Sequence, residues 1–395
     1  MDTITHGIAG ALIGKAFFDG EDLFTRKPAT ARRVASIAAT LGAIFPDADI
    51  IHDVLSRDPL TLLKWHRSWT HSVVMLPAFA LALAALTRYV ARKRSWPSPS
   101  FAVLLLIYGV GIASHIFLDY ATSFGTMLWT PLSRAREQWD LLFIIDFTLT
   151  AVVLLPQFVA ALYRARDAFP RRALQMWLGF SICAGLAAWL QTLAEFPPSL
   201  AAVLLVMVAL AALFFAPAVG GWGYRASFKN WNRAGFAAFV VYIGMAAFAH
   251  HSAMTRVETF AAEKGIGVET LGALPLPPSL LHWDGLVRTP RGVYEVRMNL
   301  RDPYPSGLQD PIEYRYYPDA PPNEFLAAAR QLPTVRTYLW FARFPVYRWR
   351  KEGDNTVVEF NDLRFLRSRR RPSPFTYRVV YGAQGNVLSQ GWAKE

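Results

Sequence analysis

The sequence predicts a mainly α polytopic membrane domain followed by a small α+β, mostly antiparallel, domain. The chain has 395 residues, 53% of them hydrophobic, and its mean hydropathy is +0.22. This composition is typical of a membrane protein that carries a soluble part. Apolar residues form long segments before residue 254, whereas later apolar runs are short and alternate with polar residues. We therefore expect a membrane-embedded helical domain at 1–253 and an extracytoplasmic domain at 254–395.

The composition also limits the chemistry of any site. Cys183 is the single cysteine and lies within an apolar run, so neither a disulfide framework nor a thiolate metal site is expected. A metal ion would have to be held by histidine and carboxylate. The net charge of +12 is assigned to cytoplasmic loops and contact with lipid headgroups, and no nucleic-acid partner is expected.

Two short apolar segments open the chain. Residues 3–18 contain Gly7, Gly10 and Gly14, which favour close helix packing. Residues 33–45 form a second segment that Pro46 is expected to end. Because neither reaches the ~20 residues of a full span, we expect 1–46 to be a helical hairpin embedded beside longer helices.

Six longer apolar segments follow, each close to the length that crosses a hydrocarbon core of ~30 Å. They are predicted to be transmembrane helices. Their approximate bounds are 72–91, 101–121, 141–163, 173–193, 199–217 and 234–253.

The links between the segments predict the topology, because basic residues collect in alternate links. These residues are Arg26, Lys27, Arg32, Arg33, Arg88, Arg92, Lys93, Arg94, Arg164, Arg166, Arg171, Arg172, Arg225, Lys229 and Arg233. The positive-inside rule places those links in the cytoplasm. All eight histidines then fall on the non-cytoplasmic side, namely His6, His52, His66, His71, His115, His250, His251 and His282. This clustering is the main indication of a functional site.

After residue 253 the pattern predicts strands and one helix. The alternating runs are Gly292–Leu300, Thr334–Arg343, Thr356–Phe360 and Phe375–Tyr381, and a helix is expected at about 322–331. The basic tract Arg364–Arg371 is interpreted as a solvated or headgroup-facing edge.

The candidate ligands each have a structural alternative. His115 and Asp119 are four apart on an apolar helix, so both can reach one ion, or they form a buried hydrogen bond. Asp47 and Asp49 follow Pro46, where carboxylates also cap helix ends. His6 is uninformative by itself, near the start of a helix.

The stretch His66–Ser72 packs two histidines, an arginine and three hydroxyl side chains against the start of an apolar run. It could be a helix entrance with Thr70 or Ser68 as the N-cap. His66 and His71 are five apart and share no helical face. They converge only if His66 lies in a loop and His71 in the first turn, so His71 is the firmer ligand.

The candidates comprise about four imidazoles and three or four carboxylates. This is more than the usual three protein ligands of a single catalytic zinc ion, and it suggests two or three ions. Nitrogen and oxygen ligands without thiolate suit Zn²⁺, Mn²⁺ or Fe²⁺. Two such ions would bind the attacking and leaving oxygens of a phosphoryl group. Arg67 could pair with a phosphate oxygen, or could be an interfacial arginine that contacts headgroups.

Four motifs, MDTITHGIAG, LGAIFPDAD, HRSWTHS and SHIFLDYATSFGT, closely resemble the membrane-bound metal-dependent hydrolase family of YdjM-like proteins. The resemblance is strong over 1–150, and PPSLLHWDGL and FNDLRFL are similar to the C-terminal region of longer members. That family is distantly similar to zinc-dependent phospholipases C and single-strand nucleases, helical enzymes with three zinc ions. The resemblance implies His6, Asp47, His71, His115 and Asp119 as ligands, and Asp49 and His66 match the nearer family's motifs. The further histidine and the His-x3-Glu pair of those enzymes are missing after Asp119, and His250, His251 and Asp146 are the candidates to substitute for them.

Together these features predict a multi-pass protein of the bacterial inner membrane that hydrolyses a phosphoester of a lipid or lipid-linked substrate. Asp47 or Asp49 would orient the attacking water, and Arg67 would stabilise the developing charge. The alternatives are a cation or proton transporter that uses the same His/Asp cluster, and a structural protein stapled by metal. The sequence does not predict the oligomeric state.

Overall fold

The computed structural model describes residues 1–18, 28–164, 169–193, 198–277, 280–303, 313–365 and 375–393. The chain divides into two compact units. The first, here called the membrane unit, comprises Met1–Ala48, Arg67–Gln138 and Ile144–Met245. The second, the C-terminal unit, comprises Asp49–His66, Trp139–Phe143 and Ala246–Glu395. The predicted boundary at residue 253 stays a prediction.

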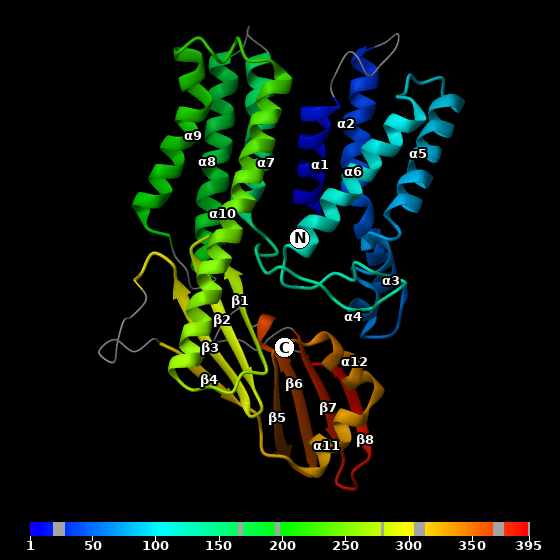
Figure 1. Ribbon diagram of the computed structural model, residues 1–395, viewed down its shortest axis with the longest axis vertical. Coiled ribbons are helices and arrows are strands. Elements are labelled where there is room, and N and C mark those ends of the chain that lie inside the picture. The colour runs from blue at the N-terminus through cyan, green and yellow to red at the C-terminus, as the bar shows by residue number, and fades with distance from the viewer. Residues whose placement is uncertain are drawn as a thin grey trace. The chain divides into compact units, whose positions relative to one another are not determined.

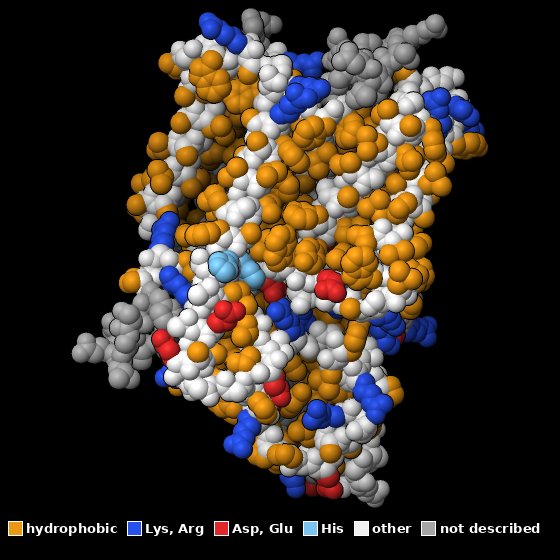
Figure 2. Space-filling model, in the orientation of Figure 1, with side chains coloured by type: hydrophobic (Ala, Val, Ile, Leu, Met, Phe, Trp, Pro, Cys, Tyr) orange, Lys and Arg blue, Asp and Glu red, His pale blue; other side chains and the backbone are white. Residues whose placement is uncertain are grey.

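Helices dominate the first part of the described chain (Figure 1). They are α1 Thr3–Phe17, α2 Pro28–Ile44, η2 Phe45–Asp49, α3 Ile50–Leu55, α4 Thr61–Trp65, η3 Trp69–His71, α5 Leu76–Lys93, α6 Phe101–Tyr120, α7 Phe147–Arg164, α8 Phe169–Leu193, α9 Leu200–Val219 and α10 Phe228–Glu263. Hydrophobic side chains cover much of the visible face of these helices (Figure 2).

Six helical segments of the described chain are long and apolar enough to cross a membrane. They are Val34–Leu55, Phe101–Tyr120, Phe147–Arg164, Phe169–Thr192, Leu200–Val219 and Phe228–Glu263. A seventh candidate is the pair Thr61–His71 and Leu76–Lys93, which is bent by 71°. The prediction of a mainly helical membrane part is confirmed.

One predicted helix boundary is confirmed and another was wrong. Helix α2 ends at Ile44, just before Pro46, and the 3-10 turn η2 and helix α3 follow it, so that Val34–Leu55 forms one candidate span of 22 residues. The predicted helix at 141–163 begins later, at Phe147. There Asp146 Oδ1 accepts the backbone N–H groups of Thr148 at 2.9 Å and Leu149 at 3.0 Å, which is the geometry of a helix N-terminal cap.

Helices α1, α2 and α6 lie side by side (Figure 1). Close glycine contacts hold them together. A Cβ atom added at Gly10 of α1 would lie 2.5 Å from Ala43 Cβ on α2. One added at Gly111 of α6 would lie 2.8 Å from the carbonyl oxygen of Ala39. Backbones can approach this closely only where no side chain intervenes. As a result, the ends of the three helices, with their polar side chains, meet at one place.

The described residues of the C-terminal unit form two antiparallel four-stranded sheets. The first has the order β1-β2-β3-β4, with strands Thr270–Leu276, His282–Thr289, Gly292–Asn299 and Arg315–Pro318. The second has the order β5-β6-β7-β8, with strands Pro345–Glu352, Asn355–Asp362, Thr376–Tyr381 and Val387–Trp392. The predicted antiparallel α+β character is confirmed, as are strands β3, β6 and β7 and the helix α11 Glu324–Gln331.

The predicted strand Thr334–Arg343 was wrong, because Pro333–Phe341 forms helix α12. Pro333 occupies the first turn, where its missing N–H costs nothing. Val335, Tyr338 and Phe341 recur every three residues and are buried on one face. Packing of this face thus prevails over the local alternation of the sequence.

Some predictions lie outside the described residues. These concern Arg26, Lys27 and Arg166 in the basic links, and the part of the tract Arg364–Arg371 that follows Phe365.

We predict that Gly10→Ala lowers the stability of the membrane unit, because the new methyl group forces α1 away from α2. The expected cost is about 1–3 kcal/mol. Thermal unfolding of the purified protein in detergent, followed by far-UV circular dichroism, would show it as a lower Tm. Gly109→Ala is the matched control, since a Cβ atom there meets nothing within 4 Å. Equal melting temperatures for Gly10→Ala and the wild type would contradict the packing argument.

Candidate metal centre

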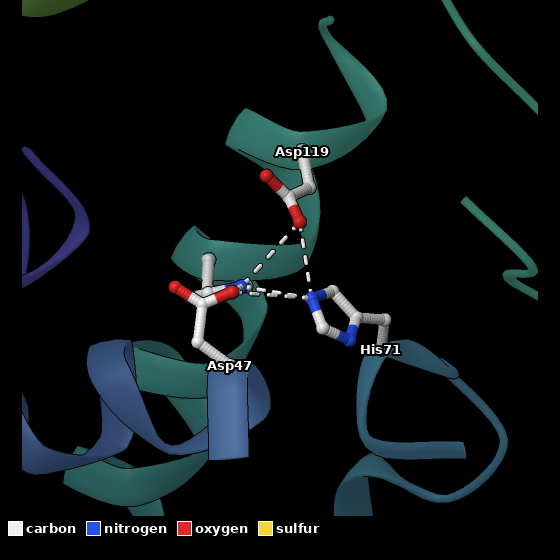
Figure 3. Close-up of side chains that lie close together, drawn as sticks. Asp47, His71 and Asp119 are labelled. Atoms are coloured by element: carbon white, nitrogen blue, oxygen red, sulfur yellow. Dashed lines mark hydrogen bonds and ion pairs between the residues drawn. The ribbon is translucent and has the colours of Figure 1, made fainter. Parts of the chain in front are cut away.

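Asp47, His71, His115 and Asp119 form a group whose potential ligand atoms all lie within 4.8 Å of one another (Figure 3). Asp47 comes from η2, His71 from η3, and the other two from the last turns of α6. His71, His115 and Asp119 are fully buried, and the Asp47 side chain is 13% exposed. The group therefore lies at the ends of apolar helices, with one ligand reaching the surface.

Asp119 is central to the group. Its Oδ2 atom lies 3.0 Å from His71 Nε2 and 3.5 Å from His115 Nε2. Asp47 Oδ1 lies 3.8 Å and 3.5 Å from the same two nitrogens. The two Nε2 atoms are 3.0 Å apart. Both imidazoles thus direct the same nitrogen toward two carboxylates.

The outer nitrogens of both imidazoles have acceptors that assign their protons. His115 Nδ1 lies 2.6 Å from the carbonyl oxygen of Ala43, which can only accept, so Nδ1 carries the proton. Thr70 Oγ1 donates to the Pro46 carbonyl oxygen at 2.7 Å, and therefore accepts from His71 Nδ1 at 3.1 Å. In their neutral forms both histidines then present lone pairs at Nε2.

Two nitrogen lone pairs and two carboxylate oxygens consequently face one another in a buried place. Acceptors repel one another, and gathering them in a buried place is costly. A divalent cation would satisfy all four, and two imidazoles with two carboxylates suit Zn²⁺, Mn²⁺ or Fe²⁺. The Nδ1–H bonds to Ala43 and Thr70 are the outer-shell contacts typical of metal-binding histidines. The four residues form a possible metal-binding site.

His6, on α1, extends the group on the other side of Asp119. Its Nε2 lies 3.1 Å from Asp119 Oδ1, and its ring stacks on that of His115 with centroids 3.7 Å apart. His6 Nδ1 is buried and has no hydrogen-bond partner among the described residues. The amino group of Met1 also contacts Asp119 Oδ1, and burial, followed by the charge of Arg67, lowers the pKa of that amino group to about 6.

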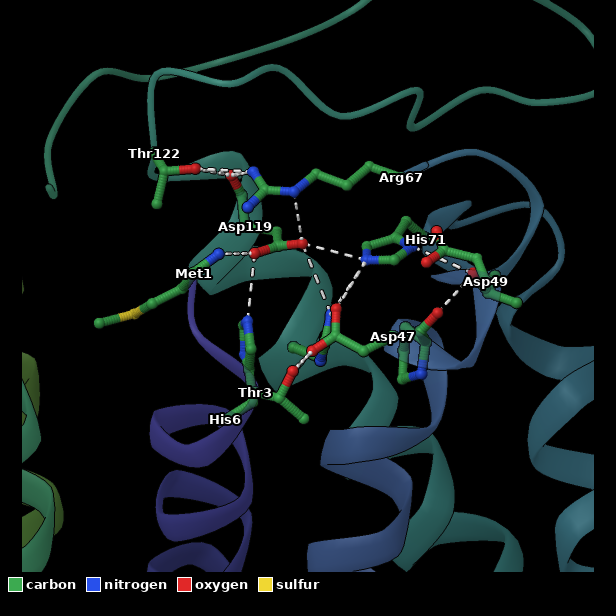
Figure 4. Close-up of polar contacts among 12 residues, drawn as sticks. Met1, Thr3, His6, Asp47, Asp49, Arg67, His71, Asp119 and Thr122 are labelled. Atoms are coloured by element: carbon green, nitrogen blue, oxygen red, sulfur yellow. Dashed lines mark hydrogen bonds and ion pairs between the residues drawn. The ribbon is translucent and has the colours of Figure 1, made fainter. Parts of the chain in front are cut away.

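Arg67 is buried and neutralises part of this negative charge (Figure 4). Its Nε atom lies 2.9 Å from Asp119 Oδ2, and one terminal nitrogen donates to Thr122 Oγ1 at 2.7 Å. The same nitrogen donates to the Asp119 carbonyl oxygen at 3.1 Å, and the guanidinium lies 5.0 Å from the Phe124 ring centroid. The side chain thereby holds Asp119 in position. Its predicted contact with a substrate phosphate stays a prediction.

Asp49 and His66 contact each other, with His66 Nδ1 3.0 Å from Asp49 Oδ1. Both belong to the C-terminal unit, and neither is in the group of four. Their predicted role as ligands stays a prediction. The spacing required His66 to lie in a loop and His71 in the first turn of a helix. His66 follows α4 and His71 lies in η3, so this arrangement is only partly present.

The three substitutes considered for a missing ligand lie elsewhere. Asp146 caps α7 and its second oxygen accepts the Tyr242 hydroxyl at 2.7 Å. His250 and His251 are on the part of α10 that belongs to the C-terminal unit, where the His250 ring lies 5.7 Å from that of Trp283. None of these three is in the group of four.

Sequence reasoning missed the residues that orient the ligands. Thr70 was considered, with Ser68, as a possible helix N-cap, whereas it links His71 to Pro46. Thr3 donates a hydrogen bond to Asp47 Oδ2, and Thr122 receives one from Arg67. Their only signal in the sequence is that each hydroxyl lies within four residues of a ligand.

A family model described as YdjM inner membrane protein matches residues 1–195. The match includes all four residues of the group and extends past the 1–150 region that the motifs indicated. Neither the curated proteins nor the solved structures provide a match to the chain. The family match and the apolar helices together identify a multi-pass membrane protein. The hydrolase activity and the similarity to phospholipases C stay predictions.

We predict that His115→Ala and Asp119→Ala lose bound metal, since each removes a ligand from the centre of the group. Thr70→Val should bind metal 10–100-fold more weakly, the usual effect of losing an outer-shell contact. Elemental analysis and metal titration of the protein in detergent would measure both effects. His52→Ala is the histidine control, because that exposed ring stacks only on Trp65 among the described contacts. Full metal content in His115→Ala would rule out the site.

Proposed function

We propose that this protein is a membrane-bound metal-dependent hydrolase that cleaves a phosphoester of a lipid or lipid-linked substrate. The observation that carries the proposal is the convergence of two fixed imidazole lone pairs and two carboxylates at the ends of apolar helices. Intramembrane ionisable residues are costly to bury and mark functional sites. At the end of a span, such a site can receive the phosphate of a lipid headgroup.

A divalent ion bound there would polarise a phosphoryl oxygen and make a bound water more acidic. Zn²⁺ is proposed first, with Mn²⁺ and Fe²⁺ as alternatives. His6 and Asp119 Oδ1, which lie 3.1 Å apart, would provide ligands for a second ion. This extends the group toward the two or three ions that the sequence suggested.

The side chains around the ion have separate roles in the proposed reaction. Asp47 is the most exposed of the four, and we propose that it or Asp49 orients the water and receives its proton. The water oxygen bonds to phosphorus as the ester P–O bond breaks, and the leaving alcohol takes up a proton. Arg67 stays paired with Asp119, and so stabilises developing charge indirectly, by keeping that carboxylate ionised and fixed.

The proposed location is the inner membrane, which the description of the matched family supports. The positive-inside rule supports an extracytoplasmic site and C-terminal domain. We predict that a periplasm-dependent reporter fused after Ala253 is active in a bacterial host. A fusion active only in the cytoplasm would reverse the topology.

We predict that the purified protein releases phosphate-containing products from phospholipid vesicles in the presence of zinc. Chelation should abolish the release, zinc should restore it, and His71→Ala should be inactive because one ligand is lost. Product release is measured by mass spectrometry, with His52→Ala as the control. Normal metal loading without turnover of any ester would instead favour a metal-stapled structural role.

A further inference from the structure

A second feature of the membrane unit is an apolar groove of about 450 Å³ between α1, α6, α7 and α10. Its lining includes Leu12, Ala113, Phe117 and Phe236, one from α1, two from α6 and one from α10. Ser114 is its one polar lining residue, and the Ser114 hydroxyl already donates to the Gly111 carbonyl oxygen at 2.8 Å. The groove therefore offers hydrocarbon contacts and almost nothing else.

The groove is next to the metal centre along two helices. On α1, Ala9 and Ile13 follow His6 by three and seven residues and so continue the same helical face. On α6, the lining residues Ser114 and Leu118 are direct neighbours of His115 and Asp119. The groove thus begins about one helical turn, ~5.4 Å, from the site.

Its walls are fixed by packing rather than left open to rearrangement. The Phe17 and Phe236 rings meet edge to face with centroids 4.9 Å apart. Arg233 of α10 donates to the Ala16 carbonyl oxygen at 3.2 Å, and Gly235 of α10 allows close approach to Pro156 of α7. These contacts hold α10 beside α1 and α7.

The surroundings of the groove select its occupant. All four helices are apolar, and α6, α7 and α10 are candidate membrane spans. Polar ligands would be unsatisfied there, because the lining offers them no partners. The volume is within the usual range of about 300–1,000 Å³ for ligand sites. A hydrocarbon chain fits these conditions.

We propose that this groove binds one hydrocarbon chain of the lipid whose phosphoester reaches the metal centre. The proposal rests on the proposed function and adds the class of substrate: a lipid that carries an acyl or prenyl chain beside its phosphoester. The headgroup lies at His6 and Asp119, and the chain extends along α1 toward Phe17.

The test uses the full chain in vesicles of phosphatidylethanolamine and phosphatidylglycerol, with a trace of phosphatidylglycerol bearing a diazirine in its acyl chain. After photolysis, mass spectrometry locates the labelled residues. Groove residues should be labelled more strongly than Ile182 of α8 and Leu205 of α9, whose apolar side chains are 71% and 69% exposed. Competition by unlabelled lipid should reduce groove labelling selectively.

Ala113→Phe fills the groove from an exposed position and should reduce groove labelling about tenfold, or ~1.4 kcal/mol of binding. Val110→Phe repeats the test one turn away, in case the first variant fails to fold. Ala102→Phe is the matched control, because it makes the same change on an exposed part of α6 outside the groove. Metal content, measured on each preparation, reports whether the fold is intact.

The outcomes separate the two proposals. Groove labelling that Ala113→Phe removes, together with weaker hydrolysis of phosphatidylglycerol at unchanged metal content, supports both. The same labelling in a protein that hydrolyses no ester overturns the proposed function and leaves chain binding supported. Equal labelling of the groove and of α8 and α9, unaffected by Ala113→Phe or Val110→Phe in metal-loaded protein, overturns the groove proposal.

Discussion

The candidate centre depends on how the protons of two imidazoles are placed. Ala43 and Thr70 accept the Nδ1–H groups of His115 and His71, so both Nε2 lone pairs face inward. Without these two hydrogen bonds, each ring could change tautomer or rotate, and the acceptors would no longer converge. The Ala43 carbonyl on α2 and the Thr70 hydroxyl in η3 are therefore as important to the site as the ligands themselves.

Helix packing supplies the rest of the geometry. Gly10 and Gly111 let α1 and α6 approach α2 until backbone atoms are in contact. This close approach brings the Ala43 carbonyl within reach of His115 and places His6 against the same ring. Arg67 then offsets the cost of burying the Asp119 carboxylate among apolar helices. The small residues at these helix contacts thus allow polar side chains from three apolar helices to meet at one place.

Helix α6 relates this centre to the apolar groove. His115 and Asp119 occupy one face, while Val110, Ala113 and Phe117 line the groove from another. A lipid is amphipathic in the same way, since its phosphate needs charge and its chain needs hydrocarbon. Both proposals therefore use one helix to bind the two chemically different parts of a single substrate.

The sequence by itself determined the helical membrane part and the antiparallel C-terminal part, because periodicity is a local property. The cost of buried charge marked histidines and aspartates as candidates, and the resemblance to the YdjM-like family implied the set of seven ligands. Only the tertiary structure decided that His71 joins Asp119 while His66 pairs with Asp49. It also decided that Arg67 is buried and that Pro333–Phe341 is a helix. The reason is the sequence separation of the contacts. His115 and Ala43 are 72 residues apart, and only long-range packing, which no local pattern encodes, brings them together.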